Sequence, residues 1–597
     1  MSTHRRTIAV LCSRGRVAAN QGHSSSFKFG YIKMRSSRNR ACAMVVVKCI
    51  RHLFFLFVLC EGFHRQLYSL SFENIAIGLD SIRQDKIKAT VEFLASSHFR
   101  GRATGSPEAM LTAGYISSIF QRNGLKPLLH SSDFIQSFEI TRTIPKPNSY
   151  FELRQRGGES YSFRINKDFV PASWGADALI MQKEGVFVGY GITAPRLNYD
   201  DYEGLDIRDK IVIMLTKVPD NEQDSFRQVS RTDYGDPIRK SIWAAHKGAA
   251  GVIRVLGPEE KLPSSSICDF NQAEAHLTIR LKSLKIPVIT LTFEAGQQLL
   301  SKCIPPHIQR QNLSQIIQLI NKELRPQTFK LEGELRLATE YRRRPVQGYN
   351  IIGVIPGSDP TLKDEYIIIG AHHDHVGVDD KGQIFFGADD NASGTAALLE
   401  LSEAFQANML KPRRSILLAA WGAEEIGLLG SRYYIRKPAV PLENTVAMFQ
   451  MDMIGRNAQH QADAVNSFPR EVAAENQNSL NVLGTWLSPD LRSSIETSNI
   501  RAGLDLKFPS DLEAIELMRR SDQWPFLKQG IPVLFLFTGF HPDYHQLTDT
   551  ADKINFAKME KILRLLYLTV WELTEARDQP TLKKALFEKL TYTGKIK

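Results

Sequence analysis

Histidine, aspartate and glutamate side chains gather at several places in the second half of this chain, each soon after a short apolar run. Imidazole and carboxylate together form the ligand set that suits zinc. Two zinc ions that share one bridging carboxylate need five protein ligands, and a hydrolytic reaction needs a base besides. The sequence offers such a set, which is, in chain order, His372, Asp389, Glu424, Glu425, Asp452 and His545.

The apolar runs before these residues predict the strands that must position them. The runs lie at 366–369, 415–420, 446–449 and 531–537. They alternate with stretches of helical pattern, and such alternation indicates an α/β sheet flanked by helices. Because open sheets of this kind place their chemistry at strand ends, we expect the histidines and carboxylates to meet at one edge of the sheet.

Short motifs around these residues resemble those of a known family. They read AHHD at 371–374, GADDNASG at 387–394, EE at 424–425, MDMIGR at 451–456 and YHQLTDTADK at 544–553. In this order they resemble the co-catalytic di-zinc exopeptidases of clan MH, which comprise bacterial secreted aminopeptidases and glutamate carboxypeptidases. The resemblance implies a zinc-peptidase fold of the α/β class, with a mixed sheet flanked by helices.

The resemblance also implies a metal-binding role for five of the residues. The implied ligands of the two zinc ions are His372, Asp389, Glu425, Asp452 and His545. Asp389 would bridge both ions, through an unusual cis peptide to Asp390. The other histidines of the first motif, His373 and His375, do not match ligand positions and are interpreted as neighbours.

Three further residues would assist the reaction. A hydroxide between two zinc ions, about 3.5–4 Å apart, would attack the scissile carbonyl. Glu424 would be the general base, which takes a proton and later gives it to the leaving amine. Asp374 would orient His372, since metal-bound imidazoles usually have such a partner. Tyr544 would lie near the developing oxyanion.

The region at 150–335 differs in character from the rest of the chain. Short β-rich pieces dominate it, and their pattern resembles the protease-associated domain that this family often inserts in its peptidase domain. We therefore divide the chain into a basic leader at 1–70, the N-terminal part of the peptidase domain at 71–149, the insert at 150–335 and the catalytic domain at 336–597. Helices are expected at 74–97 and at about 108–123.

The formal charge of +11 comes from the N-terminal end of the chain. Residues 1–60 hold eleven Lys or Arg and no Asp or Glu, and the remaining basic residues balance the acidic ones. The body is therefore neutral, which argues against a nucleic-acid partner. The basic residues precede a short apolar core at 53–60, which is a signal-peptide pattern. We expect an exported protein, with any membrane contact made only through the leader.

The cysteines add little to this interpretation. Of the six, only Cys268 and Cys303 lie outside the leader, and they could pair if the body is exported. Neither lies in a CxxC motif, so a thiolate zinc site is not expected.

Several functions stay open at this point. Our main hypothesis is an aminopeptidase that acts on peptides, and the alternative is a carboxypeptidase of the glutamate carboxypeptidase type. A metal-free receptor-like relative would lack ligands that are present here. A glutaminyl-cyclase-like acyltransferase would bind one zinc ion, and a zinc-storage protein would bind metal without turning over peptide. The sequence does not give the oligomeric state.

Overall fold

The computed structural model describes residues 75–591 apart from 128–132, 221–225, 227–233, 263–283, 306–311, 380, 458–475 and 511. The expected leader with its apolar segment, and also Cys268, lie outside the described residues. Cys303 is buried as a free thiol. Among the described residues, no helix has both the length and the apolar character that crossing a membrane requires.

The peptidase part is built on one large mixed sheet. Its strands, in spatial order, are β1 (Lys126–Pro127), β15 (Tyr341–Ile355), β19 (Ser415–Trp421), β16 (Tyr366–His372), β20 (Thr445–Met451), β23 (Val533–Phe537), β21 (Ser479–Leu483) and β22 (Asp505–Lys507), and β2 (Ile135–Pro145) also pairs with β15. The four strands β19, β16, β20 and β23 run parallel to one another, whereas β15 pairs antiparallel with β19, and β21 pairs antiparallel with β23 but parallel with β22. The mixed sheet that the sequence predicts is confirmed.

The four parallel strands form the core of the sheet. In β19, β20 and β23 every residue is buried, and in β16 only Tyr366 is partly exposed. Strands that are covered on both faces read as continuous apolar runs, which is why the four runs were visible in the sequence. Ile369 of β16 lies between Leu418 of β19 and Phe449 of β20.

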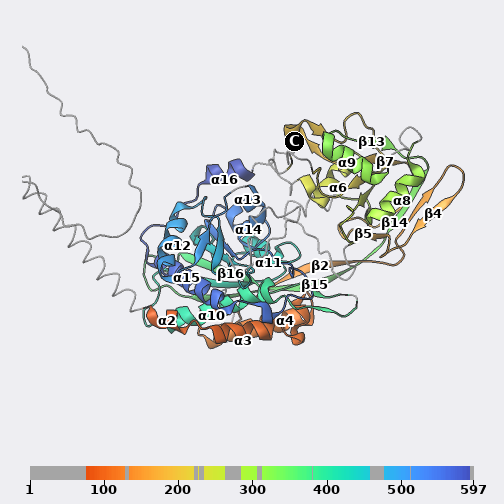
Figure 1. Ribbon diagram of the computed structural model, residues 1–597. Helices are drawn as coiled ribbons and strands as arrows, with labels where there is room; N and C mark the ends of the chain where they lie inside the picture. The colour runs from red at the N-terminus through yellow and green to blue at the C-terminus, as the bar shows by residue number, and fades with distance from the viewer. Residues whose placement is uncertain are drawn as a thin grey trace, which may run out of the picture. The chain divides into compact units, whose positions relative to one another are not determined.

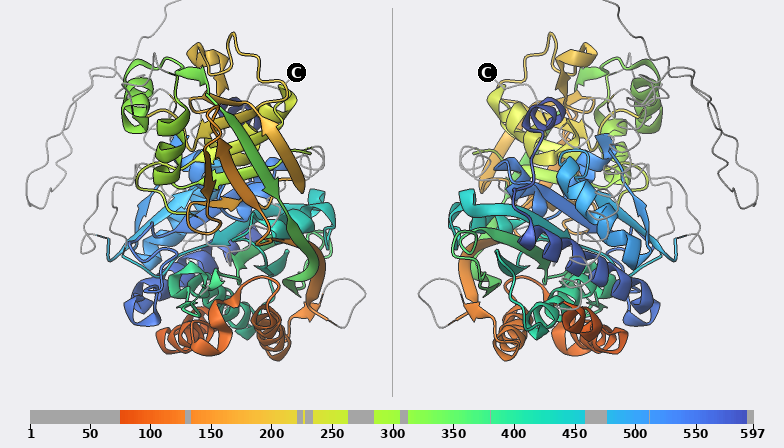
Figure 2. Two further views of the ribbon diagram at one scale, coloured as in Figure 1. Left: turned by 90° about the vertical axis from the view of Figure 1, so that its right-hand side faces the viewer. Right: turned by 90° about the vertical axis from the view of Figure 1, so that its left-hand side faces the viewer.

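Helices cover both faces of this sheet (Figure 1). On one face α10 (Gly394–Ala407) packs against β16, β19 and β20, and α15 (Phe556–Glu575) packs beside α10. Helices α2 (Ala76–Ser81) and α3 (Gln84–Leu94) pack on α10 and α15, and α4 (Pro107–Arg122) packs on β15 and α10; these three helices are drawn in red and orange in Figure 2. On the other face α11 (Leu429–Arg436) and α14 (Gln523–Lys528) contact each other and the sheet.

The remaining helices of the peptidase part lie toward the C-terminal end of the chain. They are α12 (Pro489–Ala502), which packs on α15, α13 (Leu512–Met518) and α16 (Lys584–Thr591). The single helix expected at 74–97 is instead two helices, because the backbone is extended at Ile82 and Arg83. The second expected helix is α4, whose first turn is capped by the Ser106 side chain, which accepts from the Ala109 N–H.

Among its described residues, the chain between β2 and β15 forms a two-stranded ladder, β8 (Thr193–Ala194) with β9 (Tyr199–Asp200), and two smaller sheets. One contains, in order, β13 (Thr328–Lys330), β7 (Gly185–Val188), β10 (Ile211–Leu215), β11 (Gly251–Val255), β12 (Val288–Leu291) and β5 (Phe169–Pro171). The other contains β4 (Ser160–Phe163), β3 (Tyr150–Arg154), β14 (Glu334–Thr339) and β6 (Ala178–Lys183). The α-helices among the described residues of this region are α6 (Pro237–His246), α8 (Phe293–Cys303) and α9 (Leu313–Glu323).

These smaller sheets have a core of their own, in which Phe187 and Phe329 stack with their ring centroids 5.1 Å apart. Strands β2 and β15 connect them with the main sheet as an antiparallel ribbon, from the pair Ile135–Ile351 to the pair Pro145–Tyr341 (Figure 1). The strands of these sheets correspond to the short β-rich pieces that the sequence predicts in this region.

Candidate metal centre

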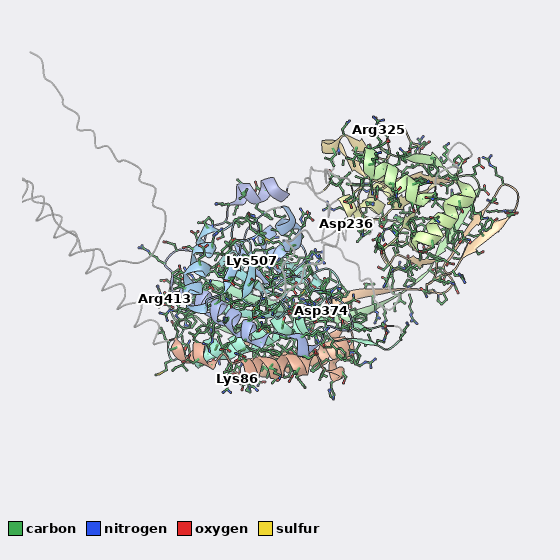
Figure 3. All side chains as sticks on the ribbon, viewed as in Figure 1. Lys86, Asp236, Arg325, Asp374, Arg413 and Lys507 are labelled. Carbon is green, nitrogen blue, oxygen red and sulfur yellow. The ribbon has the colours of Figure 1, made fainter. Side chains whose placement is uncertain are left out.

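The carboxyl ends of the four parallel strands bring the chemistry-bearing residues to one edge of the main sheet. His372 ends β16, Glu424 and Glu425 follow β19, and Asp452 follows β20. His545 comes from the loop after β23. Figure 3 labels Asp374, which lies in the same region, just after β16. The strand order β19, β16, β20, β23 explains why residues far apart in the sequence meet here.

Two groups of potential ligands lie at this edge. The first consists of His372, Glu424 and Asp452. Nε2 of His372 lies 3.1 Å from Oδ1 of Asp452 and 4.0 Å from Oε2 of Glu424. All three residues are buried.

The second group consists of His375, Asp390, Glu425 and His545. Nε2 of His545 lies 3.0 Å from Oδ2 of Asp390 and 3.0 Å from Oε2 of Glu425. Nδ1 of His375 lies 2.7 Å from Oε1 of Glu425. In each group the ligand atoms lie within 4.8 Å of one another.

Asp390 joins the two groups through its two carboxylate oxygens. Oδ1 lies 3.3 Å from Nε2 of His372, and Oδ2 lies 3.0 Å from Nε2 of His545. This is the arrangement that a carboxylate bridging two metal ions requires.

The structure contradicts the prediction that Asp389 occupies this bridging position. Asp389 is fully buried but faces away, since Oδ1 accepts a hydrogen bond from the Gly455 N–H at 2.6 Å and Oδ2 lies 3.3 Å from Nε2 of His541. The cis peptide likewise lies between Asp390 and Asn391, and not between Asp389 and Asp390. The physical reason is the irregular backbone at Asp390, which directs adjacent side chains to opposite sides.

The sequence indicated that His375 is only a neighbour of the ligands, but the structure places it in the second group of potential ligands. His373 faces neither group, and its Nε2 lies 2.9 Å from the carbonyl oxygen of Tyr349. The interpretation of His373 as a neighbour therefore agrees with its position.

Asp374 lies beside His372, although its contact with the ring differs from the expected one. Nδ1 of His372 is 3.2 Å from the backbone carbonyl of Asp374 and 3.9 Å from its carboxylate Oδ1. The carboxylate instead accepts from the Glu424 N–H at 3.0 Å and from the Thr104 hydroxyl at 2.9 Å. Asp374 thus fixes the backbone that carries Glu424 as well as the ring of His372.

The comparison with known protein families adds to this geometry. Residues 350–570 match peptidase family M28. This part of the chain is an M28 peptidase domain. It contains both groups of ligand residues.

Individual proteins are also similar to this chain. Leupeptin-inactivating enzyme 1 from Streptomyces exfoliatus is 29% identical over 255 residues, which make up 39% of this chain and 50% of that protein. The solved aminopeptidase from Aneurinibacillus sp. strain AM-1 covers 85% of this chain and 99% of its own, with a TM-score of 0.55 and 20% identity. BSAP, a zinc aminopeptidase from Bacillus subtilis, covers 84% and 98%, with a TM-score of 0.50 and 19% identity.

These similarities differ in the length of chain that they cover and in whether they concern the sequence or the fold. The chain spans half the length of the Streptomyces relative that it matches. At 20% and 19% identity, the likeness to the two aminopeptidase structures is a likeness of fold. That fold likeness extends over most of this chain, the smaller sheets included.

Burial and neighbouring charges shift the pKa values of carboxylates in the two groups of ligands. Burial alone would raise the pKa of Asp390, but the imidazoles of His372 and His545 close to its oxygens hold it well below the ordinary value. Burial would also raise the pKa of Glu425, but His545 and His375 lower it to about 2. Both carboxylates are therefore ionised at neutral pH, which is the form that binds metal ions.

Glu424 differs from these two carboxylates. Burial holds its pKa well above the ordinary value, against the lowering effect of His372, and the charges of Asp452 and Glu425 add to the rise. A carboxylate with a raised pKa is suited to accept and return a proton near neutral pH.

Two residues that support the ligand groups were not apparent from the sequence. The Ser521 hydroxyl donates to Oδ2 of Asp452 at 2.6 Å, so it directs the other carboxylate oxygen toward His372. The Arg102 guanidinium is buried and donates to the carbonyl oxygens of His373 at 3.0 Å and Gly387 at 2.9 Å. Neither residue lies near a ligand in the sequence, so no spacing could have indicated them.

A cavity opens beside the first group of ligands. It is lined by Met453, Leu517, Arg520, Phe535, Phe537, Phe540 and Tyr544, together with Ser521 and the residues His372, Asp390, Glu424 and Asp452. The Tyr544 hydroxyl accepts from Nη2 of Arg520 at 3.3 Å, and its ring stacks on that of His545 at 3.9 Å between centroids. Apolar side chains and buried carboxylates thus line this cavity together.

The donor set of the centre fits zinc. Imidazoles and carboxylates converge in groups of three and four, and buried carboxylates of this number are stable only when cations neutralise them. In addition, Nε2 of His545 is buried and has no hydrogen-bond partner of suitable geometry among the described residues. A nitrogen directed at a metal ion would have this environment.

Proposed function

We propose that the protein is a zinc-dependent exopeptidase, and specifically an aminopeptidase that removes N-terminal residues from peptides. The observation that carries the proposal is Asp390, whose oxygens face His372 at 3.3 Å and His545 at 3.0 Å. One carboxylate shared between two imidazole–carboxylate groups is the arrangement that a pair of zinc ions requires.

In this proposal each residue of the centre has one role. His372 and Asp452 would hold one zinc ion, Glu425 and His545 would hold the other, and Asp390 would be shared by both. The bound zinc ions would polarise the scissile carbonyl and activate a water molecule for attack on it.

Glu424 would be the general base. The residue is 8% exposed, so it is shielded from bulk water while it lines the cavity. It would take the proton of the attacking water and return it to the leaving amine. The hydrogen bond from its own N–H to Asp374 fixes the backbone at this position. Tyr544 lines the same cavity, and its hydroxyl would donate a hydrogen bond to the developing oxyanion.

The direction of attack is supported by the comparisons. Both solved structures named above are aminopeptidases, and their fold covers 85% and 84% of this chain. An aminopeptidase must hold a free ammonium group, and the buried carboxylates of the centre supply negative charge for that purpose.

One observation favours a carboxypeptidase as the second candidate. Arg520 lines the cavity, and its guanidinium lies over the rings of Phe540 at 4.8 Å and Tyr544 at 6.0 Å. A guanidinium in such a place could bind the free carboxylate of a peptide.

Blocking each end of one peptide in turn separates the two candidates. We expect N-acetylation of a short leucyl peptide to abolish its hydrolysis, and amidation of its C-terminus to change the rate little. The reverse pattern, together with a large increase in KM for Arg520→Gln, would establish the carboxypeptidase and refute the aminopeptidase.

The wider organisation is also part of the proposal. We propose that the leader at 1–70 exports the protein, and that the sheets within 150–335 form a protease-associated insert without catalytic residues. Every residue that is assigned a catalytic or metal-binding role lies between His372 and His545, which is outside the insert.

A further inference from the structure

We propose that His375 is a fourth protein ligand of the second zinc ion, beside Asp390, Glu425 and His545. The proposal rests on the proposed function, because it concerns the same pair of zinc ions. The motifs that resemble the exopeptidase family give this position no role, so the assignment comes from the placement of the side chain alone.

The distances around His375 fit a zinc site. Ligands about 2.0–2.1 Å from a tetrahedral zinc ion lie about 3.3 Å from one another. In the second group, Nδ1 of His375 lies 2.7 Å from Oε1 of Glu425 and 3.7 Å from Oδ2 of Asp390. Nε2 of His545 is 3.0 Å from an oxygen of each of these carboxylates. One ligand atom from each of the four donor groups thus lies within 4.8 Å of those of the other three.

The ring of His375 is fixed in this position. The residue is 1% exposed, and its ring packs against Gly387. A Cβ atom on Gly387 would lie 2.5 Å from Cγ of His375, so only glycine leaves room for the ring there. Gly387 also has a φ of +59°, which favours glycine for a second reason.

Arg102 ties together the two segments that carry His375 and Asp390. Its guanidinium donates to the carbonyls of His373 and Gly387, and its own carbonyl accepts from the His375 N–H at 3.4 Å. A ligand whose backbone and ring are both held in this way is preorganised for metal binding.

The extra ligand would make the two zinc sites unequal. The second site would have four protein ligands, including the shared Asp390, whereas the first would have three when Glu424 serves as the base. We therefore expect the second site to hold zinc more tightly, and the two ions to bind in sequence.

The test compares His375→Asn with His373→Asn. The amide of Asn can still donate a hydrogen bond to Glu425, but it is a poor zinc ligand. His373 is a matched control, because it is buried on the same segment and faces neither group. Zinc affinities of the metal-free proteins would be measured by competition with a chromophoric chelator. X-ray absorption of the wild-type protein with two zinc ions would count its imidazole ligands.

We expect three imidazoles for two zinc ions in the wild type, and two in His375→Asn. The zinc affinity of the second site should fall by more than about 100-fold in His375→Asn, beyond the effect typical of losing an outer partner. His373→Asn should keep both affinities.

Two results would overturn the assignment. Two imidazoles in the wild type would exclude His375 as a ligand, even if its substitution weakened zinc binding, since it would then only position Glu425. Wild-type affinities in His375→Asn would exclude both roles. Failure of the proposed function has a different signature, which is a wild-type protein that binds no pair of zinc ions.

Discussion

Glu424 and Glu425 are consecutive in the chain, yet their carboxylates face different groups of ligands. Oε2 of Glu424 lies 4.0 Å from Nε2 of His372, and Oε2 of Glu425 lies 3.0 Å from Nε2 of His545. Adjacent residues of the same type therefore allow a direct comparison of a base with a ligand.

Substitution of each glutamate by glutamine should have a different effect. Glu424→Gln should keep both zinc ions and lower kcat by roughly 10²–10⁴, because the base is lost. Glu425→Gln should weaken zinc binding instead. Zinc content by mass spectrometry and kcat on an aminoacyl-anilide provide the two readouts. If zinc loss accompanied the substitution at position 424, the two roles would have to be exchanged.

The neighbouring aspartates should differ in the same way. Asp390→Asn should weaken both zinc sites, because its oxygens face both His372 and His545. Asp389→Asn should keep the zinc ions and lower thermal stability, because the buried contacts with Gly455 and His541 change. Zinc content and melting temperature would be measured for both variants. Loss of zinc only in the Asp389 variant would restore the assignment made from the sequence.

Asp389 and Asp390 also show a feature of the site that could not be predicted from the sequence. The motif at 387–394 indicated that an aspartate bridges the metal ions, but two aspartates stand side by side in it. Only the non-helical backbone at Asp390, with φ −106° and ψ 95°, decides which carboxylate turns toward the histidines. No periodicity reports such a local geometry.

The elements of the sheet were more predictable. The four parallel strands are buried almost throughout, so their apolar runs stand out in the sequence. The break between α2 and α3 was missed, because Ile82 and Arg83 continue the helical spacing of apolar and polar residues although their backbone is extended. Ser521 and Arg102 reach the centre only through the tertiary fold.

The Arg102 side chain should contribute strongly to stability. It donates to the carbonyls of Leu94, His373, Phe386 and Gly387, so Arg102→Met leaves these buried acceptors without their partner. We expect the free energy of unfolding to fall by about 3 kcal/mol. Chemical denaturation would measure it.

Arg100→Met is the matched control for this prediction. The Arg100 side chain is 53% exposed and forms an ion pair with Glu108 at 3.6 Å, and such surface pairs contribute little. Equal destabilisation by the two substitutions would contradict the role of Arg102.

The leader should be dispensable for catalysis. A chain that starts at Phe72 should fold and keep its kcat, because residues 1–60 show no core-forming pattern and the assigned residues all lie far downstream. Circular dichroism and steady-state kinetics would compare it with the full-length protein. A well-folded but inactive truncated chain would show that the leader is part of the enzyme.

Zinc titration tests the central claim most directly. The protein would be stripped of metal with a chelator, and zinc would be added back while peptide hydrolysis and bound zinc are followed together. The shared position of Asp390 predicts that the metal-free protein is inactive and that the activity reaches its plateau at about two zinc ions per chain. Hydrolysis at the full rate by the metal-free protein, or a plateau at one zinc ion, would contradict a two-zinc exopeptidase.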